Sequence, residues 1–347
     1  MQTLIERLKN IRKQAYLKMK FNKKFAFIGI GNHSINNLYP VLNYLRIDLK
    51  YIVTQGLKNA GTIDQNFPNV IGTNDLNAVL KDPEISGVFI CVNPKAHFGL
   101  VKKVLQAGKN VFIEKPPCST IEELNELIEI DKESKGVCLV GLQKRYAPVN
   151  LEMKKFCRTT CSYSYRFLTG SYPEGDPFLD IFIHPIDLVN YLFGPAKVVS
   201  ILKQNRGGST TIFLQLIHEN STIGSIELST AYSWQTALEE LVVNTNKGIY
   251  RSTNTENLLF EPKHGQIFNL PLEKVLNKHS TSIALVQKNS FNPVIENNQI
   301  YSSGYYSELF DFIKICEYGK GANHSTLSQC LNTYQLITKI RDEKNVH

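Results

Sequence analysis

The sequence predicts an α/β fold in which an N-terminal doubly wound parallel sheet is followed by an α+β domain with a mostly antiparallel sheet. From residue 24 to about 145, short apolar runs alternate with stretches of helical period. A glycine-rich turn follows the first apolar run. After about residue 150, polar and apolar residues alternate, as in antiparallel strands. We therefore divide the 347 residues into an arm (1–23), a first domain (24–145) and a second domain (146–347).

The arm carries most of the formal net charge of +8, because residues 1–24 hold eight basic residues and one acid. Leu4, Leu8, Ile11 and Ala15 recur at helical spacing and predict a basic amphipathic helix. We expect its apolar stripe to dock on its own domain or on a sister subunit. The alternative is a membrane surface or a polyanion. The nearly neutral remainder, with 31 basic and 30 acidic residues, argues against nucleic-acid binding.

The first domain contains six apolar runs that predict strands, at residues 24–30, 49–54, 69–73, 87–92, 110–114 and 136–141. Helical periodicity is clearest at 96–108 and 120–134. Strands that are apolar on both faces indicate a parallel sheet covered on both sides, which is a Rossmann-like arrangement. Pro40 should delay or kink the first helix of this domain, because proline removes a helical hydrogen bond.

The turn after the first strand has the pattern G-x-G-x-x-S, with Gly29, Gly31, Asn32, His33 and Ser34 as candidate cofactor-binding residues. The first glycine permits a tight turn and the second lets the backbone approach a pyrophosphate. Ser34 is small enough for the third position, where helix packs on strand. Because the motif follows a strand, it favours a dinucleotide site over a plain turn.

The end of the second strand bears on the choice of cofactor. NAD-selective domains usually carry an acid there for the ribose 2′-hydroxyl, and this sequence has none. Thr54 or Gln55 could bond a hydroxyl or a phosphate oxygen, and Lys58 could neutralise a 2′-phosphate or be an ordinary surface lysine. The sequence therefore leaves NAD and NADP both open.

The second domain contains alternating stretches that predict strands at 160–168, 196–204, 210–218, 221–230 and 240–246, and two helical segments close the chain. An Asn- and Ser-rich stretch around 275–300 predicts a loop. Seven scattered cysteines without a C-x-x-C pair indicate reduced thiols, no zinc site and a cytoplasmic location. No apolar run is long enough to span a membrane, and we expect no stable membrane association.

Two segments point to a family. Glu114-Lys115-Pro116-Pro117 ends the fifth strand, and D-x-x-x-H-x-x-D follows at Asp180, His184 and Asp187. Together with the stretches at 93–97, 141–148 and 304–316, they resemble the Gfo/Idh/MocA family of NAD(P)-dependent oxidoreductases. The resemblance implies an open antiparallel sheet that serves homo-oligomerisation. It also implies hydride transfer between a nicotinamide and a hydroxyl or keto carbon of a sugar or sugar derivative.

The resemblance also assigns roles to residues. His184 becomes the acid or base for the hydroxyl proton, Asp180 tunes it, and Lys115 bonds the reacting oxygen. Further cofactor contacts are expected at Asn93, Pro94, His97, Glu114 and Lys115 itself, and substrate contacts at Arg145, Tyr146, Asp180 and His184.

Other interpretations stay open for these residues. Asp180 and His184 could form a purely structural polar cluster, and Asp187 is expected to be structural. Pro185 suggests that a helix begins only just before it, which would place Asp180 near the cap. A non-catalytic nucleotide-binding sensor or regulatory protein with the same fold is the alternative function.

Overall fold

The computed structural model describes residues 2–267, 270–271, 274 and 281–345, and the chain divides into two compact units. The first unit comprises Met1–Glu114, Glu129–Leu139 and Leu309–Asn323. The second comprises Lys115–Ile128, Val140–Glu308 and His324–His347. The chain therefore passes between the units several times, and a segment near its C-terminus belongs to the first unit.

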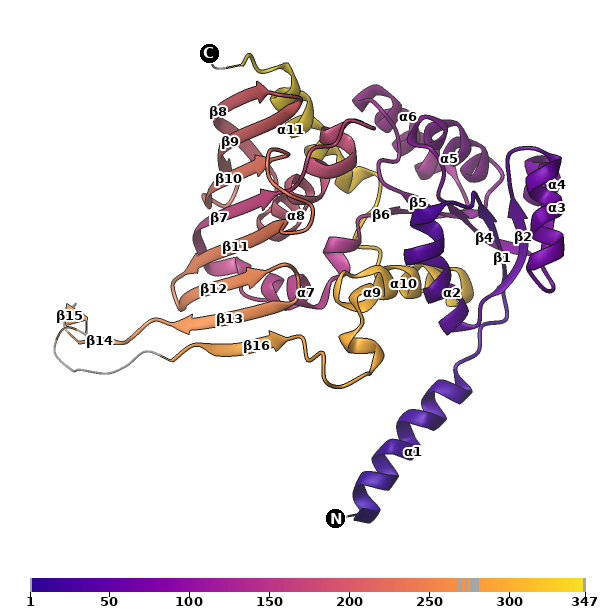
Figure 1. The fold of residues 1–347 in the computed structure, drawn as a ribbon, viewed down its shortest axis with the longest axis horizontal. Coiled ribbons are helices and arrows are strands. Elements are labelled where there is room, and N and C mark those ends of the chain that lie inside the picture. Colours follow the sequence, from indigo (N-terminus) through magenta and orange to yellow (C-terminus); the bar gives the residue numbers. More distant parts are fainter. Residues whose placement is uncertain (1, 268–269, 272–273, 275–280, 346–347) are drawn as a thin grey trace. The chain divides into compact units, whose positions relative to one another are not determined.

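The first unit is built on a six-stranded sheet of order β3-β2-β1-β4-β5-β6 (Figure 1). The pairings from β3 to β5 are all parallel. The order reverses between β1 and β4, so the loops after these two strands lie next to each other, where such sheets bind ligands. The strands are β1 (Lys24–Ile28), β2 (Asp48–Val53), β3 (Ile71–Thr73), β4 (Ile85–Ile90), β5 (Asn110–Glu114) and β6 (Cys138–Gly141), all six of which the sequence predicts.

Helices cover the first sheet because its strands are apolar on both faces. Phe89 of β4 packs edge-on against Phe312 of α10, with ring centroids 5.1 Å apart. Phe27 of β1 stacks on Tyr39 of α2 at 4.6 Å. Helix α5 contacts β4 and β5. The helices of the first unit are α1 (Gln2–Lys18), α2 (Tyr39–Leu45), α3 (Leu57–Asn66), α4 (Leu76–Lys81), α5 (His97–Gln106) and most of α10 (Tyr305–Tyr318). Helix α6 (Ile121–Glu133) belongs mostly to the second unit, and only its C-terminal end belongs to the first.

Two helices contain a π-helical turn just before a proline. The first, η1 (Ser34–Leu38), precedes Pro40, and the second, η5 (Phe178–Phe182), precedes Pro185. Proline lacks an N–H and its ring crowds the carbonyl four residues earlier, so a wider turn relieves both problems. The α-helical segments α2 and α8 begin at Tyr39 and Ile183, just before the prolines as expected, but each continues helical structure that starts earlier. Helical structure begins at residues 32 and 177 and passes through the π turn.

The second unit is built on an eight-stranded sheet of order β16-β13-β12-β11-β7-β10-β9-β8. Every pairing is antiparallel except β7 with β10. The strands are β7 (Thr160–Leu168), β8 (Ala196–Arg206), β9 (Ser209–His218), β10 (Ile223–Ser229), β11 (Leu238–Thr245), β12 (Gly248–Thr253), β13 (Asn257–Pro262) and β16 (Ile283–Gln287). The sequence predicts the first five. Strand β16 lies in the stretch expected to be a loop, of which residues 275–280 are outside the described part.

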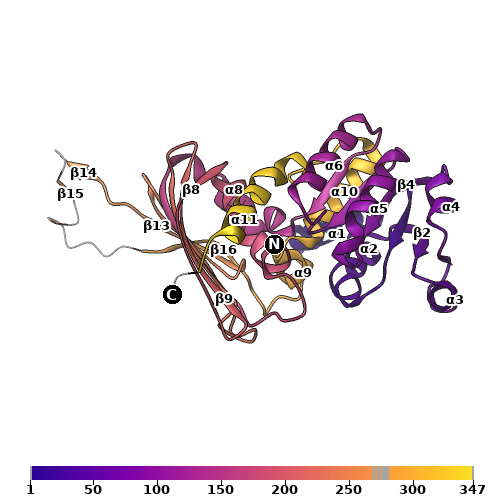
Figure 2. The ribbon, with the colours of Figure 1, turned by 90° about the horizontal axis from the view of Figure 1, so that it is seen from above.

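One face of this second sheet is covered and the other is open. Helices α7 (Pro148–Lys154), α8 (Ile183–Phe193) and α11 (Leu331–Asp342) belong to this unit. Helices α8 and α11 lie on one side of the sheet (Figure 2), where α11 contacts β8. On the opposite face Val199, Phe213, Ile217 and Ile223 are exposed. The remaining elements are α9 (Gln299–Ser302) and the small strands β14 (Gln266–Ile267) and β15 (Leu270–Pro271), which pair with each other.

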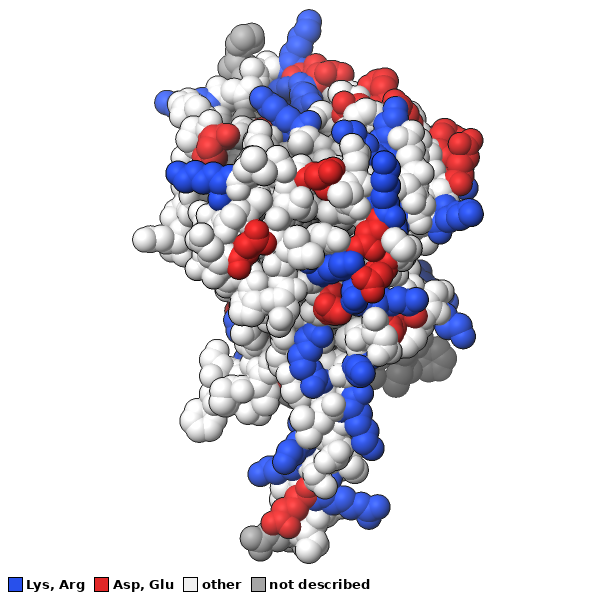
Figure 3. Space-filling view, turned by 90° about the vertical axis from the view of Figure 1, so that its right-hand side faces the viewer, with Lys and Arg blue, Asp and Glu red and all other residues white. Residues whose placement is uncertain are grey.

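Helix α1 confirms the basic amphipathic helix but not its expected docking. Leu4 is 60% exposed and Ile11 is 56% exposed. The contacts of this region with the rest of the first unit that the described residues show lie at its C-terminal end, where Tyr16 packs against Tyr44 and Arg46 donates to the carbonyls of Tyr16 and Met19. Basic side chains project from several sides of the helix (Figure 3). Its apolar stripe does not dock on the chain's own domain.

None of the seven cysteines, all of which lie in the described part of the chain, forms a disulfide. None of the described helices combines the length and the apolar character that a membrane crossing requires.

Candidate active site

The turn after β1 is shaped by Gly29. Its φ is +98°, and a Cβ at this position would lie 2.2 Å from the carbonyl oxygen of Cys91. Its N–H donates to the carbonyl of Val53. Only glycine meets both requirements, because other residues would be strained at this φ and would clash with the neighbouring loop.

At Gly31 the backbone and the neighbouring residues do not require a glycine, in contrast to Gly29. A Cβ on Gly31 would have no heavy atom within 4 Å, so nothing in the chain itself excludes a side chain there. The space beside it is what a pyrophosphate needs, next to the first turn of a helix that begins at Asn32. The Ser34 hydroxyl accepts from the Gly31 N–H and donates to the Gly31 carbonyl, both at 2.9 Å. Ser34 therefore closes the turn from within, which explains why it can replace the usual third glycine.

His33 and Glu114 meet across the ends of β1 and β5. The His33 Nε2 atom lies 3.2 Å from Glu114 Oε1, and Asn37 Nδ2 lies 3.2 Å from His33 Nδ1. The Glu114 carboxylate is almost fully buried, whereas His33 is partly exposed. The structure thus brings together two predicted cofactor residues that are far apart in the sequence.

The other predicted cofactor residues follow β2 and β4. Thr54 is buried and donates to the Gly56 carbonyl at 3.4 Å, while Gln55 and Lys58 are exposed. Asn93 caps the short helix that begins at Pro94, and its side chain accepts from the Lys95 N–H. His97 is buried with Nε2 3.0 Å from the Val92 carbonyl, a contact that holds its own loop.

In the second unit, Lys115 meets the segment that carries Asp180 and His184. Lys115 Nζ donates to the main-chain carbonyl of Asp180 at 2.5 Å, across 65 residues of sequence. Asp180 Oδ2 accepts from the Asp176 N–H at 2.9 Å. Lys115, Asp180 and His184 are each half-buried among fully buried neighbours such as Phe182. The three polar groups are therefore fixed in place and still reachable.

The structure does not fit the predicted substrate contacts of Arg145 and Tyr146, because both side chains are buried. Arg145 is only 2% exposed, and its five N–H donors all go to protein acceptors: both Asp187 carboxylate oxygens, the carbonyls of His324 and Gln329, and Gln329 Oε1. Tyr146 is fully buried and bonds Ser325 and the His324 N–H. Neither side chain has a polar group left for a substrate.

Asp187 completes this buried network as a structural residue, since it also accepts from the Thr333 hydroxyl at 3.0 Å. Burial alone would lower the pKa of Arg145, but the adjacent Asp187 carboxylate outweighs it and raises that pKa.

Residues 23–142 match the Gfo/Idh/MocA family model, described as an oxidoreductase family with an NAD-binding Rossmann fold. Over these residues, which correspond to the first domain, the chain is similar to the Gfo/Idh/MocA family.

Known proteins extend the likeness beyond that domain. The scyllo-inositol 2-dehydrogenase (NAD(+)) of Bacillus subtilis is 25% identical over 206 residues, covering 52% of this chain and 59% of the relative. The chain spans 27% to 59% of the length of eight curated relatives.

Among solved structures, a dehydrogenase from Chromobacterium violaceum superposes with a TM-score of 0.77 at 19% identity, covering 92% of this chain and 94% of that one. A 3-ketoreductase from Actinomadura kijaniata, in complex with TDP-benzene and NADP, gives 0.71 at 13% identity, covering 93% and 98%. These likenesses establish that the fold extends over both units.

The structure adds two residues that the Gfo/Idh/MocA motifs do not mark. Tyr172, on the loop after β7, lies beside Asp180, and its ring contacts that of Trp234 on the loop after β10. Their one signal in the sequence is the pair of glycines at 170 and 175 in a loop just before the D-x-x-x-H segment, and a glycine pair alone does not indicate what packs on it.

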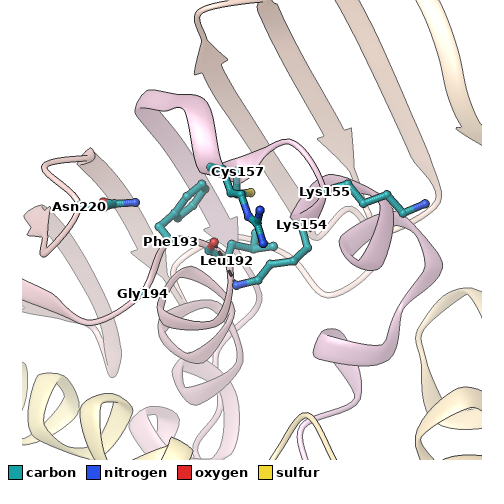
Figure 4. A pocket seen from close by; sticks show the side chains of 8 residues that line it. Lys154, Lys155, Cys157, Leu192, Phe193, Gly194 and Asn220 are labelled. Atoms are coloured by element: carbon teal, nitrogen blue, oxygen red, sulfur yellow. Dashed lines mark hydrogen bonds between the residues drawn. The ribbon is translucent and has the colours of Figure 1, made fainter. Parts of the chain in front are cut away.

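A pocket of about 520 Å³ opens at the other end of α8 from His184 (Figure 4). Lys154 Nζ lies within it and donates to the Tyr191 and Leu192 carbonyls, which end the helix. This lysine compensates the negative helix end, so helix capping explains the position of Lys154 in the pocket. Its lining residues are Lys154, Lys155, Cys157, Arg158, Leu192, Phe193, Gly194 and Asn220.

Proposed function

We propose that this protein is an NAD(P)-dependent oxidoreductase of the Gfo/Idh/MocA family, acting on a hydroxyl or keto carbon of a sugar or sugar derivative. One observation carries the proposal. The second unit holds the Lys115 ammonium against the helix that presents Asp180 and His184, although these residues are far apart in sequence. An ammonium, a carboxylate and an imidazole that are half-exposed in an apolar surrounding match what alcohol oxidation and ketone reduction require.

Each of the three groups has a distinct task in this reaction. The His184 imidazole takes the hydroxyl proton during oxidation and returns it during reduction, because its pKa range lies near neutrality. Lys115 donates a hydrogen bond to the reacting oxygen and offsets the negative charge that develops there. Asp180 lies one turn before His184 in the same continuous helix, from where it would orient the imidazole.

The glycine-rich turn fits a dinucleotide. Open space beside Gly31 and the helix start at Asn32 would take the pyrophosphate, and Glu114 would bond the adjoining ribose. When bound, the nicotinamide accepts or supplies the hydride. The end of β2 offers Thr54, Gln55 and Lys58 without an acid, and this combination supports NADP at least as well as NAD.

Two further proposals concern the state of the whole protein. We infer a homo-oligomer that buries the open face of the second sheet, because Val199, Phe213, Ile217 and Ile223 form an apolar group there. The seven free cysteines support a reducing compartment, for which we propose the cytoplasm.

The function can be tested with the purified protein. Denaturation followed by analysis of the released nucleotides identifies any bound NAD or NADP. Turnover is then followed through the absorbance of the reduced nicotinamide with a panel of sugars, cyclitols and sugar nucleotides. We expect turnover in the wild type, a rate at least about 100-fold lower in His184→Ala, and a normal rate in the control His264→Ala.

Two results would count against this proposal. A full rate in His184→Ala would contradict the assigned proton transfer. Cofactor binding without turnover on any member of the panel would favour the non-catalytic sensor.

A further inference from the structure

Two aromatic side chains lie beside the reacting groups of the second unit and belong to none of the family's motifs. We propose that Tyr172 and Trp234 form an aromatic wall that stacks on the ring of a cyclic substrate. The site then prefers a pyranose or a cyclitol to an open-chain polyol. This inference rests on the proposed function, because Lys115, Asp180 and His184 supply the polar groups next to the wall.

The wall is connected to the reacting groups by direct contacts. The rings of Tyr172 and Trp234 meet edge to face, with centroids 6.4 Å apart and planes at 64°. A Cβ on Gly175 would lie 2.5 Å from Tyr172 Cε1 and 2.4 Å from Asp180 Oδ2, so the ring and the carboxylate are neighbours over the same glycine. The Asp180 carbonyl in turn accepts from Lys115 Nζ. Trp234 is therefore linked to Lys115 through Tyr172 and Asp180.

The rings of Trp234 and Tyr172 each pack directly against a glycine, Gly170 and Gly175 respectively. A Cβ on Gly170 would lie 2.3 Å from Trp234 Cδ1, and Gly175 plays the same part under Tyr172. Any larger residue at either position would have to push a ring away, because real Cβ atoms do not approach other heavy atoms so closely. The backbone is thus shaped to hold these two rings where they are.

The polar ends of both rings are already occupied. The indole N–H of Trp234 donates to the Ser171 carbonyl at 2.9 Å, yet 54% of the residue remains exposed. Burial, and then the charge of Asp180, raises the pKa of Tyr172, as expected when the hydroxyl faces that carboxylate. What the wall offers to a ligand is aromatic carbon surface directly beside a polar group.

That combination matches a ring with hydroxyls on its rim. A pyranose or a cyclitol carries C–H bonds on its faces and hydroxyls around its edge, so one face can lie on an aromatic ring while an edge hydroxyl reaches Lys115 and His184. An open-chain polyol has no flat apolar face. The wall should therefore discriminate between the two by binding rather than by chemistry.

Trp234 is the only tryptophan in the chain, so emission excited selectively from tryptophan, and not from the 16 tyrosines, reports on this wall alone. The protein is titrated with glucose, myo-inositol and UDP-glucose, and in parallel with sorbitol as the open-chain control. We expect at least one cyclic compound to change the emission saturably and sorbitol to leave it unchanged at the same concentration. Tyr172→Ala should weaken the response to the cyclic compound.

Kinetics on the cyclic compound that turns over give a second readout. Trp234→Ala should raise KM about ten-fold with kcat within about two-fold, the pattern of lost binding away from the reacting atoms. Gly170→Ala keeps both aromatic side chains but displaces the indole, and should raise KM in the same direction. Phe291→Ala, at a residue that is 95% exposed, is the matched control and should change neither constant.

The outcomes separate the two proposals. Turnover with unchanged emission and an unchanged KM in Trp234→Ala would overturn the aromatic wall while leaving the oxidoreductase function intact. Saturable emission changes with cyclic compounds, but no turnover on any of them, would support the wall and contradict the function. Equal responses to sorbitol and to the cyclic compounds would overturn the preference for rings.

Discussion

At the residue scale, Arg145 is held by the protein and not by a ligand. Its guanidinium pairs with Asp187 through two hydrogen bonds, at 2.5 and 2.7 Å, in a fully buried setting. Removing one partner of such a pair leaves an uncompensated buried charge. Arg145→Ala should therefore lower the free energy of unfolding by roughly 3–5 kcal/mol in a denaturant titration.

The matched control for this variant is Arg158→Ala, which removes an exposed arginine and should change the unfolding free energy by less than about 0.5 kcal/mol. A stable Arg145→Ala protein with a higher KM would instead restore Arg145 as a substrate contact.

The two glycines of the nucleotide turn should respond oppositely to the same substitution. Gly29→Ala should cost at least about 1–3 kcal/mol of stability, because of its positive φ and the nearby Cys91 carbonyl. Gly31→Ala should leave stability within about 0.5 kcal/mol but weaken cofactor binding about ten-fold, since its Cβ would fill the space kept for the pyrophosphate.

Thermal melts and a cofactor titration on both variants check this contrast. Unchanged cofactor affinity in Gly31→Ala would show that the open space has another purpose.

Site residues that belong to sequence motifs could be predicted from the sequence. Contacts that form only through tertiary packing could not. The glycine-rich turn, Lys115 and the D-x-x-x-H segment could be found from spacing and resemblance. The hydrogen bonds of Arg145 to Asp187, His324 and Gln329 could not be predicted, because these partners lie 42 to 184 residues away in the chain. The contact between Tyr172 and Trp234 could not be predicted for the same reason.

At the element scale, His218 joins two strands and a helix. It ends β9, its Nε2 lies 2.9 Å from the Tyr163 hydroxyl of β7, and its Nδ1 lies 2.6 Å from the Gly194 carbonyl after α8. Burial lowers the pKa of His218, against the opposing effect of the Gly194 carbonyl. The unfolded chain therefore binds the proton more readily than the folded one, and stability should fall as the pH drops below about 6.5.

This prediction is checked by the unfolding free energy measured between neutral and acid pH. His218→Gln should lose less stability on acidification than the wild type, whereas the control His264→Gln should behave like the wild type. Equal acid sensitivity in His218→Gln would mean that other groups dominate the acid response.

The periodicity of the sequence predicted whether most segments form helices or strands. It did not predict the short strands or the π turns. Strands with clear apolar runs were predicted throughout the first unit and in five cases in the second. Strands β12 and β13 are short and carry polar residues at their ends, so their pattern resembles that of loops. Strand β16 is a short apolar run inside a stretch rich in Asn and Ser, and that composition hid it. The π turns before Pro40 and Pro185 were missed because proline alone suggests a helix start, while tertiary packing here maintains the helix through the proline.

At the scale of the whole molecule, helix α1 should contribute little to the stability of the chain that carries it. Its apolar side chains are more than half exposed from Leu4 to Ile11, and the hydrogen bonds described for it lie at its C-terminal end. Deletion of residues 1–15 should change the unfolding free energy by less than about 1 kcal/mol, as measured by denaturant titration. A large loss would show that the helix packs on the body in solution.

The same deletion separates the two roles still open for the helix. A smaller oligomer after deletion would support docking on a sister subunit. Lost binding to anionic liposomes or to heparin would support a membrane-surface or polyanion role.

The central claim is that Lys115 acts on the reacting oxygen during hydride transfer, and single-turnover kinetics test it most directly. Protein loaded with its oxidised cofactor is mixed with the substrate identified in the panel, and the reduced nicotinamide is followed by its absorbance. We expect Lys115→Met to slow this step at least about 100-fold, while Lys155→Met, at an exposed lysine paired with Glu152, reacts at the wild-type rate. A wild-type rate in Lys115→Met would contradict the account.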